Sequence, residues 1–165
     1  MMKNIVLIVL GLAVVWFFAV SLPLWIAAAE FGRLPISLGG LRFVGWIPIT
    51  LGASAILVCY ATFLSVGKGT PWPFDPPRRL VTTGLYRLTR NPMEGGFLLV
   101  VLGEVLWFES SVLLLYGLCG FLYFHWRQVF VEEPALVDRF GECYERYRDD
   151  VPRWIPRVKI FTKEE

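Results

Sequence analysis

The chain has 165 residues, of which 56% are hydrophobic and 18% are charged, and its mean hydropathy is +0.57. A soluble domain of this length does not need so apolar a composition, so we predict an integral membrane protein. The net charge of +2 gives no indication of a nucleic-acid partner. The three cysteines, Cys59, Cys119 and Cys143, are too widely spaced for a metal-ligand motif, which argues against a zinc site and against a disulfide framework.

The N-terminal part of the chain contains two long apolar runs. Residues 5–29 carry no charge and are interrupted only by Pro23, so they are long enough to cross a hydrocarbon core of about 30 Å. A cleaved signal peptide is the alternative, but the run is too long and lacks a small-residue cleavage site followed by a soluble domain. Residues 43–66 form the second run, with small residues that favour close helix packing in a bilayer. We therefore predict two transmembrane helices in residues 1–66.

Residues 67–90 interrupt the apolar pattern with prolines and positive charge, which indicates a loop at a membrane face. Against the single Asp75, this loop contains five basic residues: Lys68, Arg78, Arg79, Arg87 and Arg90. The tail after residue 133 is also rich in arginine. Because positive charge favours the cytoplasmic side of a membrane, we expect the loop and the tail there.

Two further apolar helices are predicted after the loop. Asn91 followed by Pro92 is typical of a helix start, because an Asn side chain can accept from free N–H groups and Pro fits the first helical position. A helix over residues 92–108 would span about 25 Å, which is marginal for a full crossing. Residues 97–108 and 112–131 then form a hairpin that turns at 109–111. The count is four spans, with both termini in the cytoplasm.

The fourth helix is expected to end at a pair of carboxylates. Pro134 lacks the N–H that would bond back to Phe130, so the helix must kink or stop, and a new one can begin there. Glu132 and Glu133 then lie at the junction, where two carboxylates beside a bilayer need water, a cation or a ligand. A solvated helix end is the alternative. Beyond it, apolar residues at spacings of three or four predict one amphipathic helix: Leu136, Phe140, Tyr144 and Tyr147.

Together these elements predict an all-α, polytopic membrane protein with a single domain over residues 1–165. About four transmembrane helices are expected, with two of them in residues 1–66. The loop, the helical hairpin and the C-terminal amphipathic helix of residues 67–165 would form the functional site. We expect a multi-pass protein of the cell inner membrane.

The predicted helix start after the basic loop is a candidate anion site. A helix N-terminus presents free N–H groups and partial positive charge, and Arg87 and Arg90 lie just upstream of Asn91. A carboxylate or phosphate group fits these surroundings. No glycine fingerprint of a Rossmann nucleotide site follows a predicted strand in this sequence.

Polar groups within the apolar helices are further candidates. Glu104 lies in the middle of the third helix, where an ionisable group is either functional or protonated and hydrogen-bonded between helices. His125, Gln128 and Glu132 share one face of an α-helical fourth segment, so His125 is either a catalytic base or a packing residue. The same α-helical spacing predicts that the side chain of Arg127 points to a different side of the helix from that of Glu132. Arg127 would hold a substrate carboxylate or extend to the membrane interface.

An ordered series of motifs occupies the second half of the chain. In order these are Gly84-Leu85-Tyr86-Arg87, Arg90-Asn91-Pro92-Met93, Gly103, Glu132-Glu133, Leu136, Phe140-Gly141, Tyr144, Tyr147 and Val151-Pro152-Arg153. The series resembles the C-terminal signature of the isoprenylcysteine carboxyl methyltransferase family, which also includes phospholipid N-methyltransferases. The stretch from Gly69 to Leu80 resembles bacterial and archaeal members. The resemblance covers roughly residues 67–157.

The resemblance implies S-adenosylmethionine bound at the cytoplasmic face and a lipophilic acceptor, a lipid or a lipidated molecule with a carboxylate or an amine, entering from the bilayer. The cofactor-binding residues it points to are Tyr86, Arg87, Arg90, Asn91, Pro92, Glu132, Glu133 and Tyr144. The arginines and the helix start suit the cofactor's carboxylate, and a glutamate suits its ammonium. Arg127, Glu104 and His125 are the candidates for catalysis.

One departure from the family pattern leaves alternatives open. Glu94 stands where the family motif usually has Tyr, and it either forms a capping box with Asn91 or alters the substrate or cofactor site. An inactive membrane scaffold of the same fold is therefore one alternative to a methyltransferase. An NADPH-dependent reductase is the other, because sterol reductases have a similar C-terminal region, although four spans are few for that class.

Overall fold

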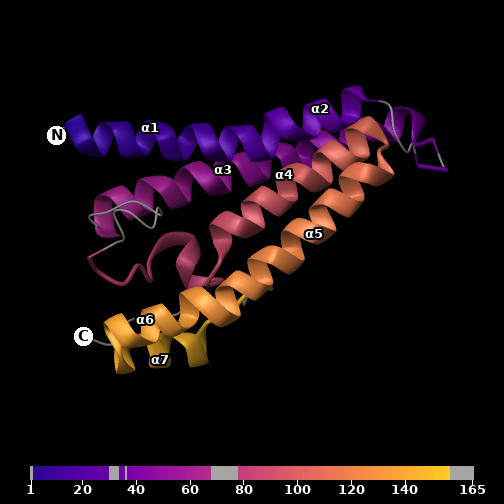
Figure 1. The fold of residues 1–165 in the computed structure, drawn as a ribbon. Coiled ribbons are helices and arrows are strands. Elements are labelled where there is room, and N and C mark those ends of the chain that lie inside the picture. The colour runs from indigo at the N-terminus through magenta and orange to yellow at the C-terminus, as the bar shows by residue number, and fades with distance from the viewer. Residues whose placement is uncertain (1, 30–33, 36, 68–77, 157–165) are drawn as a thin grey trace. The chain divides into compact units, whose positions relative to one another are not determined.

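The computed structural model describes residues 2–29, 34–35, 37–67 and 78–156, and its elements are helices. Figure 1 shows them in chain order. The chain divides into two compact units. Unit 1 consists of Met1–Ser54 and Gly96–Phe121, and unit 2 of Ala55–Gly95 and Leu122–Glu165. The all-α prediction is confirmed for the described residues.

In unit 1 the first apolar run forms a long helix with one widened turn. Helix α1 spans Met2–Trp16, a π-helical turn spans Phe17–Ser21, and α2 spans Leu22–Ala28. Pro23 lies in the first turn of α2, where its missing N–H leaves a carbonyl of the preceding turn without its helical donor. The π turn directly before it is a common way to absorb such a break.

Helices α3 and α4 approach each other through glycines. A 3₁₀ turn (Gly39–Gly45) leads into α3 (Trp46–Thr62), and α4 spans Pro92–Phe108. A Cβ atom added to Gly45 would collide with the backbone of Gly103, and one added to Gly52 with the backbone of Gly96. The small residues of the second apolar run therefore have the packing role that the sequence predicts.

The turn between α4 and α5 (Ser111–Arg127) contacts the connection between α2 and α3. Glu109 has a φ of 52°, which is uncommon for a residue with a side chain. Its carbonyl accepts a hydrogen bond from the N–H of Leu34 at 2.6 Å, and its Oε1 accepts one from the N–H of Leu38 at 2.9 Å. Leu34, Leu38 and the α4–α5 turn therefore lie at the same end of unit 1.

Two helical segments are long and apolar enough to cross a membrane, Val9–Ala28 and Gly39–Gly67, and they coincide with the two predicted N-terminal spans. Helix α4 begins at Pro92 and ends at Phe108, as predicted. Each of α4 and α5 is 17 residues long, and a π turn (Gln128–Glu132) extends α5. The four-span count stays a prediction.

Unit 2 corrects the predicted C-terminal helix. The chain forms two short helices, α6 (Glu133–Phe140) and α7 (Glu142–Asp150), instead of one. Gly141 separates them with a φ of 54°, a conformation that glycine adopts without strain. The predicted apolar residues still pack in one cluster, because the break turns α7 so that Tyr144, Tyr147 and Val151 are buried against Leu136 and Phe140.

The loop before α4 belongs to unit 2. A π turn (Phe63–Gly67) ends the second apolar run, and a 3₁₀ turn (Gly84–Arg87) precedes α4. Tyr86 is buried there with Cys59 and Val81. The prediction of a loop at Lys68 and Asp75, and the motif from Gly69, fall on residues 68–77, which lie outside the described residues.

Cysteine labelling tests the four-span topology. Ser37 and the first residue of α5 lie near the same end of unit 1, so Ser37→Cys and Ser111→Cys should react with an impermeant maleimide from one side of the membrane. The exposed natural Cys143 should react from the other side. Each variant would carry no other cysteine, and a permeant reagent is the control. Labelling of Ser111→Cys from the Cys143 side would show that α4 and α5 do not cross.

Candidate functional site

Unit 2 contains a cavity of about 400 Å³. This volume lies within the range of small-molecule sites, which runs from about 300 to 1,000 Å³. Its wall comes from the loop before α4, the first turn of α4, the end of α5, and helices α6 and α7. The apolar part of the wall is formed by Phe63, Leu80, Val81, Met93, Val131, Ala135, Leu136 and Phe140. The polar part is formed by Tyr86, Arg90, Asn91, Glu94, Arg127, Gln128, Glu132, Arg139, Tyr144 and Tyr147.

The start of α4 brings two donors without partners to this wall. Asn91 is only 6% exposed, and its Nδ2 has no hydrogen-bond partner among the described residues. The same holds for Nε of Arg90 within the described part of the chain. Both residues line the cavity, and buried donors in a folded protein are normally paired, so these two atoms mark this part of the wall as a candidate binding region.

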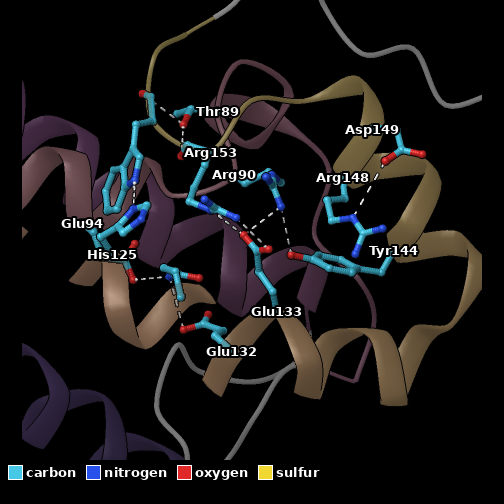
Figure 2. A network of polar contacts seen from close by, with 12 residues as sticks. Thr89, Arg90, Glu94, His125, Glu132, Glu133, Tyr144, Arg148, Asp149 and Arg153 are labelled. Atoms are coloured by element: carbon cyan, nitrogen blue, oxygen red, sulfur yellow. Dashed lines mark hydrogen bonds and ion pairs between the residues drawn. The ribbon is translucent and has the colours of Figure 1, made fainter. Parts of the chain in front are cut away.

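Glu133 lies at the centre of a buried ion cluster, which Figure 2 shows. Its Oε1 accepts from Nη1 of Arg90 at 2.9 Å and from Nε of Arg153 at 2.7 Å, and its Oε2 accepts from Nη2 of Arg153 at 3.0 Å. Nη1 of Arg90 also reaches the hydroxyl of Tyr144 at 3.4 Å. Glu133, expected to bind the cofactor, is instead engaged by two arginines, and it is not part of the cavity wall.

A second cluster joins two carboxylates on another part of the wall. Nη2 of Arg127 lies 3.1 Å from Oε1 of Glu94 and 2.7 Å from Oε2 of Glu132. Nε2 of Gln128 donates to the same two oxygens at 3.2 and 3.3 Å. The carboxylate of Glu94, for which the sequence left open both a capping box and a place in the site, is thus held by the side chains of Arg127 and Gln128. Two negative groups share one positive group here.

The contact between Arg127 and Glu132 corrects the predicted orientation of Arg127. The prediction assumed an α-helix, in which the two side chains point to different sides. Residues Gln128–Glu132 form a π turn, whose repeat is wider and brings positions five apart onto one side. Pro134 follows in the first turn of α6 and has no N–H to donate to the carbonyl of Phe130, four residues before it, as an α-helix would require.

The pKa of Glu132 is raised in this position, first by burial and then by a neighbouring carboxylate. Burial of the carboxyl group is the largest cause, and the negative charge of Glu94 adds to it. Arg127 acts in the opposite direction, and the pKa is about 7. Since the side chain is 36% exposed, the proton can exchange with solvent. Glu132 is therefore a carboxyl group that changes charge near neutral pH.

Three tyrosines complete the wall in their neutral forms. Burial raises the pKa of Tyr86 well above its ordinary value, and it also raises the pKa of Tyr144 and of Tyr147. The hydroxyl of Tyr147 donates to the carbonyl of Tyr86 at 2.7 Å, which joins α7 to the loop before α4. These groups donate or accept hydrogen bonds at neutral pH and do not act as bases.

The other predicted site residues lie elsewhere. Pro92 is buried at the start of α4 without lining the cavity, and Arg87 is exposed. His125 accepts a hydrogen bond at Nδ1 from Nε1 of Trp154 at 3.1 Å and is not part of the cavity wall. Glu104 is buried in unit 1, where its Oε2 has no partner among the described residues. Of the three catalytic candidates, only Arg127 lines the cavity.

Several residues of the site were not singled out from the sequence. Gln128 was placed on the right face, but its bridging role depends on the π turn. Arg139 lines the cavity and showed no signal beyond a charged helix face. Arg153 was part of a motif, and its pairing with Glu133 could not be inferred from two residues twenty positions apart.

The fold and the cavity define a helical protein with membrane-type spans and a polar site at the ends of its helices. The chain belongs to the phospholipid methyltransferase family, whose model matches residues 41–143. It is also similar to the protein-S-isoprenylcysteine O-methyltransferase of Schizosaccharomyces pombe, with 39% identity over 80 residues. That match covers 48% of this chain and 34% of the relative, so the matched segment is about a third of the relative's length.

Replacement of Glu133 tests the ion cluster. Glu133→Gln leaves Arg90 and Arg153 without their shared negative charge, so we expect a loss of about 2 to 4 kcal/mol in stability. Thermal unfolding of the detergent-solubilised protein measures it. Glu142→Gln is the matched control, because Glu142 is exposed and lies 3.7 Å from Arg146, and it should change little. Equal stability of both variants would contradict the cluster.

Proposed function

We propose that the protein transfers a methyl group from S-adenosylmethionine to a lipophilic acceptor in the membrane, at the cytoplasmic face. The proposal rests on one observation: hydrogen-bond donors and carboxylates occupy different parts of the cavity wall. The unpartnered donors of Arg90 and Asn91 require an acceptor group, and the carboxylates of Glu94 and Glu132 exceed their shared cation by one charge. A ligand with both a carboxylate and positive charge satisfies both parts.

The residues of the cavity fit the cofactor of this family. Arg90 and Asn91 would hold its carboxylate, and Glu132 would hold its ammonium group through a charge-assisted hydrogen bond. Tyr144 and Tyr86 give the wall aromatic surface. When bound, S-adenosylmethionine supplies a methyl group on a positively charged sulfur. The volume of about 400 Å³ suits a ligand of this size class.

Methyl transfer mainly requires that donor and acceptor are held in line, and the cavity wall would do this by positioning. The apolar residues, among them Phe63, Val131 and Leu136, exclude water and admit a lipid chain. An amine acceptor must lose a proton before it reacts, whereas a carboxylate need not.

The acidic pair favours an amine over a carboxylate as the acceptor. Nη2 of Arg127 already contacts Glu94 and Glu132, so this guanidinium is not open to a substrate carboxylate as the sequence analysis supposed. A third negative group beside these two carboxylates would be repelled. We therefore propose a lipophilic amine, and we place the cavity on the cytoplasmic side because of the positive charge around it.

Calorimetric titration tests the cofactor. The purified protein should bind S-adenosylmethionine and its demethylated product but not NADPH. Affinity for S-adenosylmethionine should rise several-fold from pH 6 to pH 7.5, because Glu132 loses its proton over this range and then attracts a cation. Glu132→Gln should weaken binding and remove this pH dependence, and Glu142→Gln should not. Binding of NADPH alone would support a reductase, and binding of none of them an inactive scaffold.

Replacement of Glu94 tests whether the methyl acceptor is an amine. Glu94→Gln keeps the size of the side chain and removes one negative charge from the acidic pair, so KM for a long-chain amine should rise about tenfold, the effect of roughly 1.4 kcal/mol. Affinity for the cofactor should change much less. Radiolabelled methyl transfer to matched long-chain amine and fatty acid acceptors provides the measurement. If the fatty acid is the better acceptor for the parent, the amine assignment is wrong.

A further inference from the structure

Gln128 contacts both members of the acidic pair, Glu94 and Glu132, without carrying a charge of its own. Its Nε2 lies 3.2 Å from Oε1 of Glu94 and 3.3 Å from Oε2 of Glu132. An amide nitrogen has two N–H donors, so it can donate one to each carboxylate. The amide oxygen could not take this place, because it would face two negatively charged acceptors. The two carboxylates therefore decide which end of the amide points toward them.

Burial fixes the side chain of Gln128 more tightly than that of its charged neighbour. Gln128 is 2% exposed, whereas the side chain of Arg127 is 31% exposed. Nη2 of Arg127 contacts the same two carboxylate oxygens, at 3.1 and 2.7 Å. Holding a long, partly exposed side chain in one conformation costs entropy, whereas packing already confines a buried one. Gln128 is therefore the more rigid of these two bridges between the carboxylates.

The bridge formed by Gln128 holds like charges close together and leaves them charged. Two ionised carboxylates repel each other, so donors must offset that repulsion at this distance. Arg127 offsets it with a positive charge, which compensates one of the two negative charges. An amide donates hydrogen bonds and brings no charge, so one negative charge of this cluster stays uncompensated. Such an arrangement attracts a positively charged group of a ligand.

We propose that Gln128 is a positioning residue: its uncharged amide ties the carboxylate of Glu132 to that of Glu94, which holds Glu132 in place for the ammonium group of the cofactor and leaves its charge uncompensated. This inference rests on the proposed function, which assigns that ammonium to Glu132. Glu94→Gln should still change cofactor affinity little, because a glutamine oxygen also accepts from the amide of Gln128. The contribution of Gln128 should depend on the ammonium group of the ligand.

Titration with two ligands that differ in that group tests the inference. The probes are S-adenosylmethionine and its deaminated form, measured by calorimetry on the whole chain at pH 7.5, where Glu132 is largely ionised. Gln128→Met keeps the length of the side chain and removes both donors, so it should weaken binding of S-adenosylmethionine about tenfold. Binding of the deaminated form should change by no more than about threefold. A purely structural role would reduce both affinities together.

Gln128→Lys separates the position of the carboxylates from their charge. A lysine ammonium can donate to both carboxylates, so the bridge and the fold should persist, but its positive charge compensates the remaining negative charge. Affinity for S-adenosylmethionine should then fall about tenfold or more, and affinity for the deaminated form by no more than about threefold. A purely structural bridge would leave both affinities as they are in the parent protein.

Two controls accompany these variants. Carboxyl-carbon NMR should show a lower pKa of Glu132 in Gln128→Lys, because a second cation beside Arg127 then acts against the negative charges of Glu94 and Glu133. This shift verifies that the lysine reaches the pair. Leu113→Met is the matched control for the change to methionine. Leu113 is 0% exposed in unit 1 and does not line the cavity, so both affinities should stay those of the parent.

The outcomes separate the two proposals. A parent protein that binds neither ligand overturns the proposed function and this inference with it. A parent that binds both equally well has no ammonium site, which overturns only the inference. Equal losses of both affinities in Gln128→Met, or no loss, also overturn it, and so does unchanged affinity for S-adenosylmethionine in Gln128→Lys. If Gln128→Met does not fold, Gln128→Lys alone decides. Losses confined to S-adenosylmethionine support the inference.

Discussion

The carboxylate of Glu133, shared by Arg90 and Arg153, is the contact on which unit 2 depends. It joins three segments that are distant in sequence: the loop before α4, the start of α6 and the segment after α7. All three side chains are largely shielded from water, so removal of one charge would leave the others without compensation. The cost of such a loss makes this arrangement specific. Two hydrogen bonds to backbone carbonyls reinforce it, one from the hydroxyl of Thr89 to Arg153 and one from the N–H of Arg90 to Pro152.

A second constraint, the π turn before Pro134, sets the acidic side of the cavity. An α-helix would have separated Arg127 from Glu132, and the wider turn brings them to 2.7 Å. Glu94 then completes a pair of carboxylates around one guanidinium. Burial, and after it the negative charge of Glu94, raises the pKa of Glu132. Arg90 lies on one part of the cavity wall and the acidic pair on another, and the proposed function rests on this division.

Structural features that depend only on residues close together in the sequence were predicted correctly. Asn91-Pro92 and the charged turn at Glu109 define α4 as Pro92–Phe108, because helix ends are decided by which backbone groups nearby side chains can satisfy. The first two apolar runs agree with the two candidate spans, since length and hydropathy are properties of the chain itself. The motifs from Gly84 to Arg153 also indicated the family, which the match over residues 41–143 confirms.

Residue composition and order by themselves determined the helical class, the apolar spans, the start of α4 and the break at Pro134, because each follows from local chemistry. Only the tertiary structure decided the partners of the charged residues. Glu133 meets Arg90 and Arg153, Glu94 meets Arg127, and His125 meets Trp154, across separations of 20 to 43 residues. Such pairings depend on where the π turn and Gly141 direct the following helices.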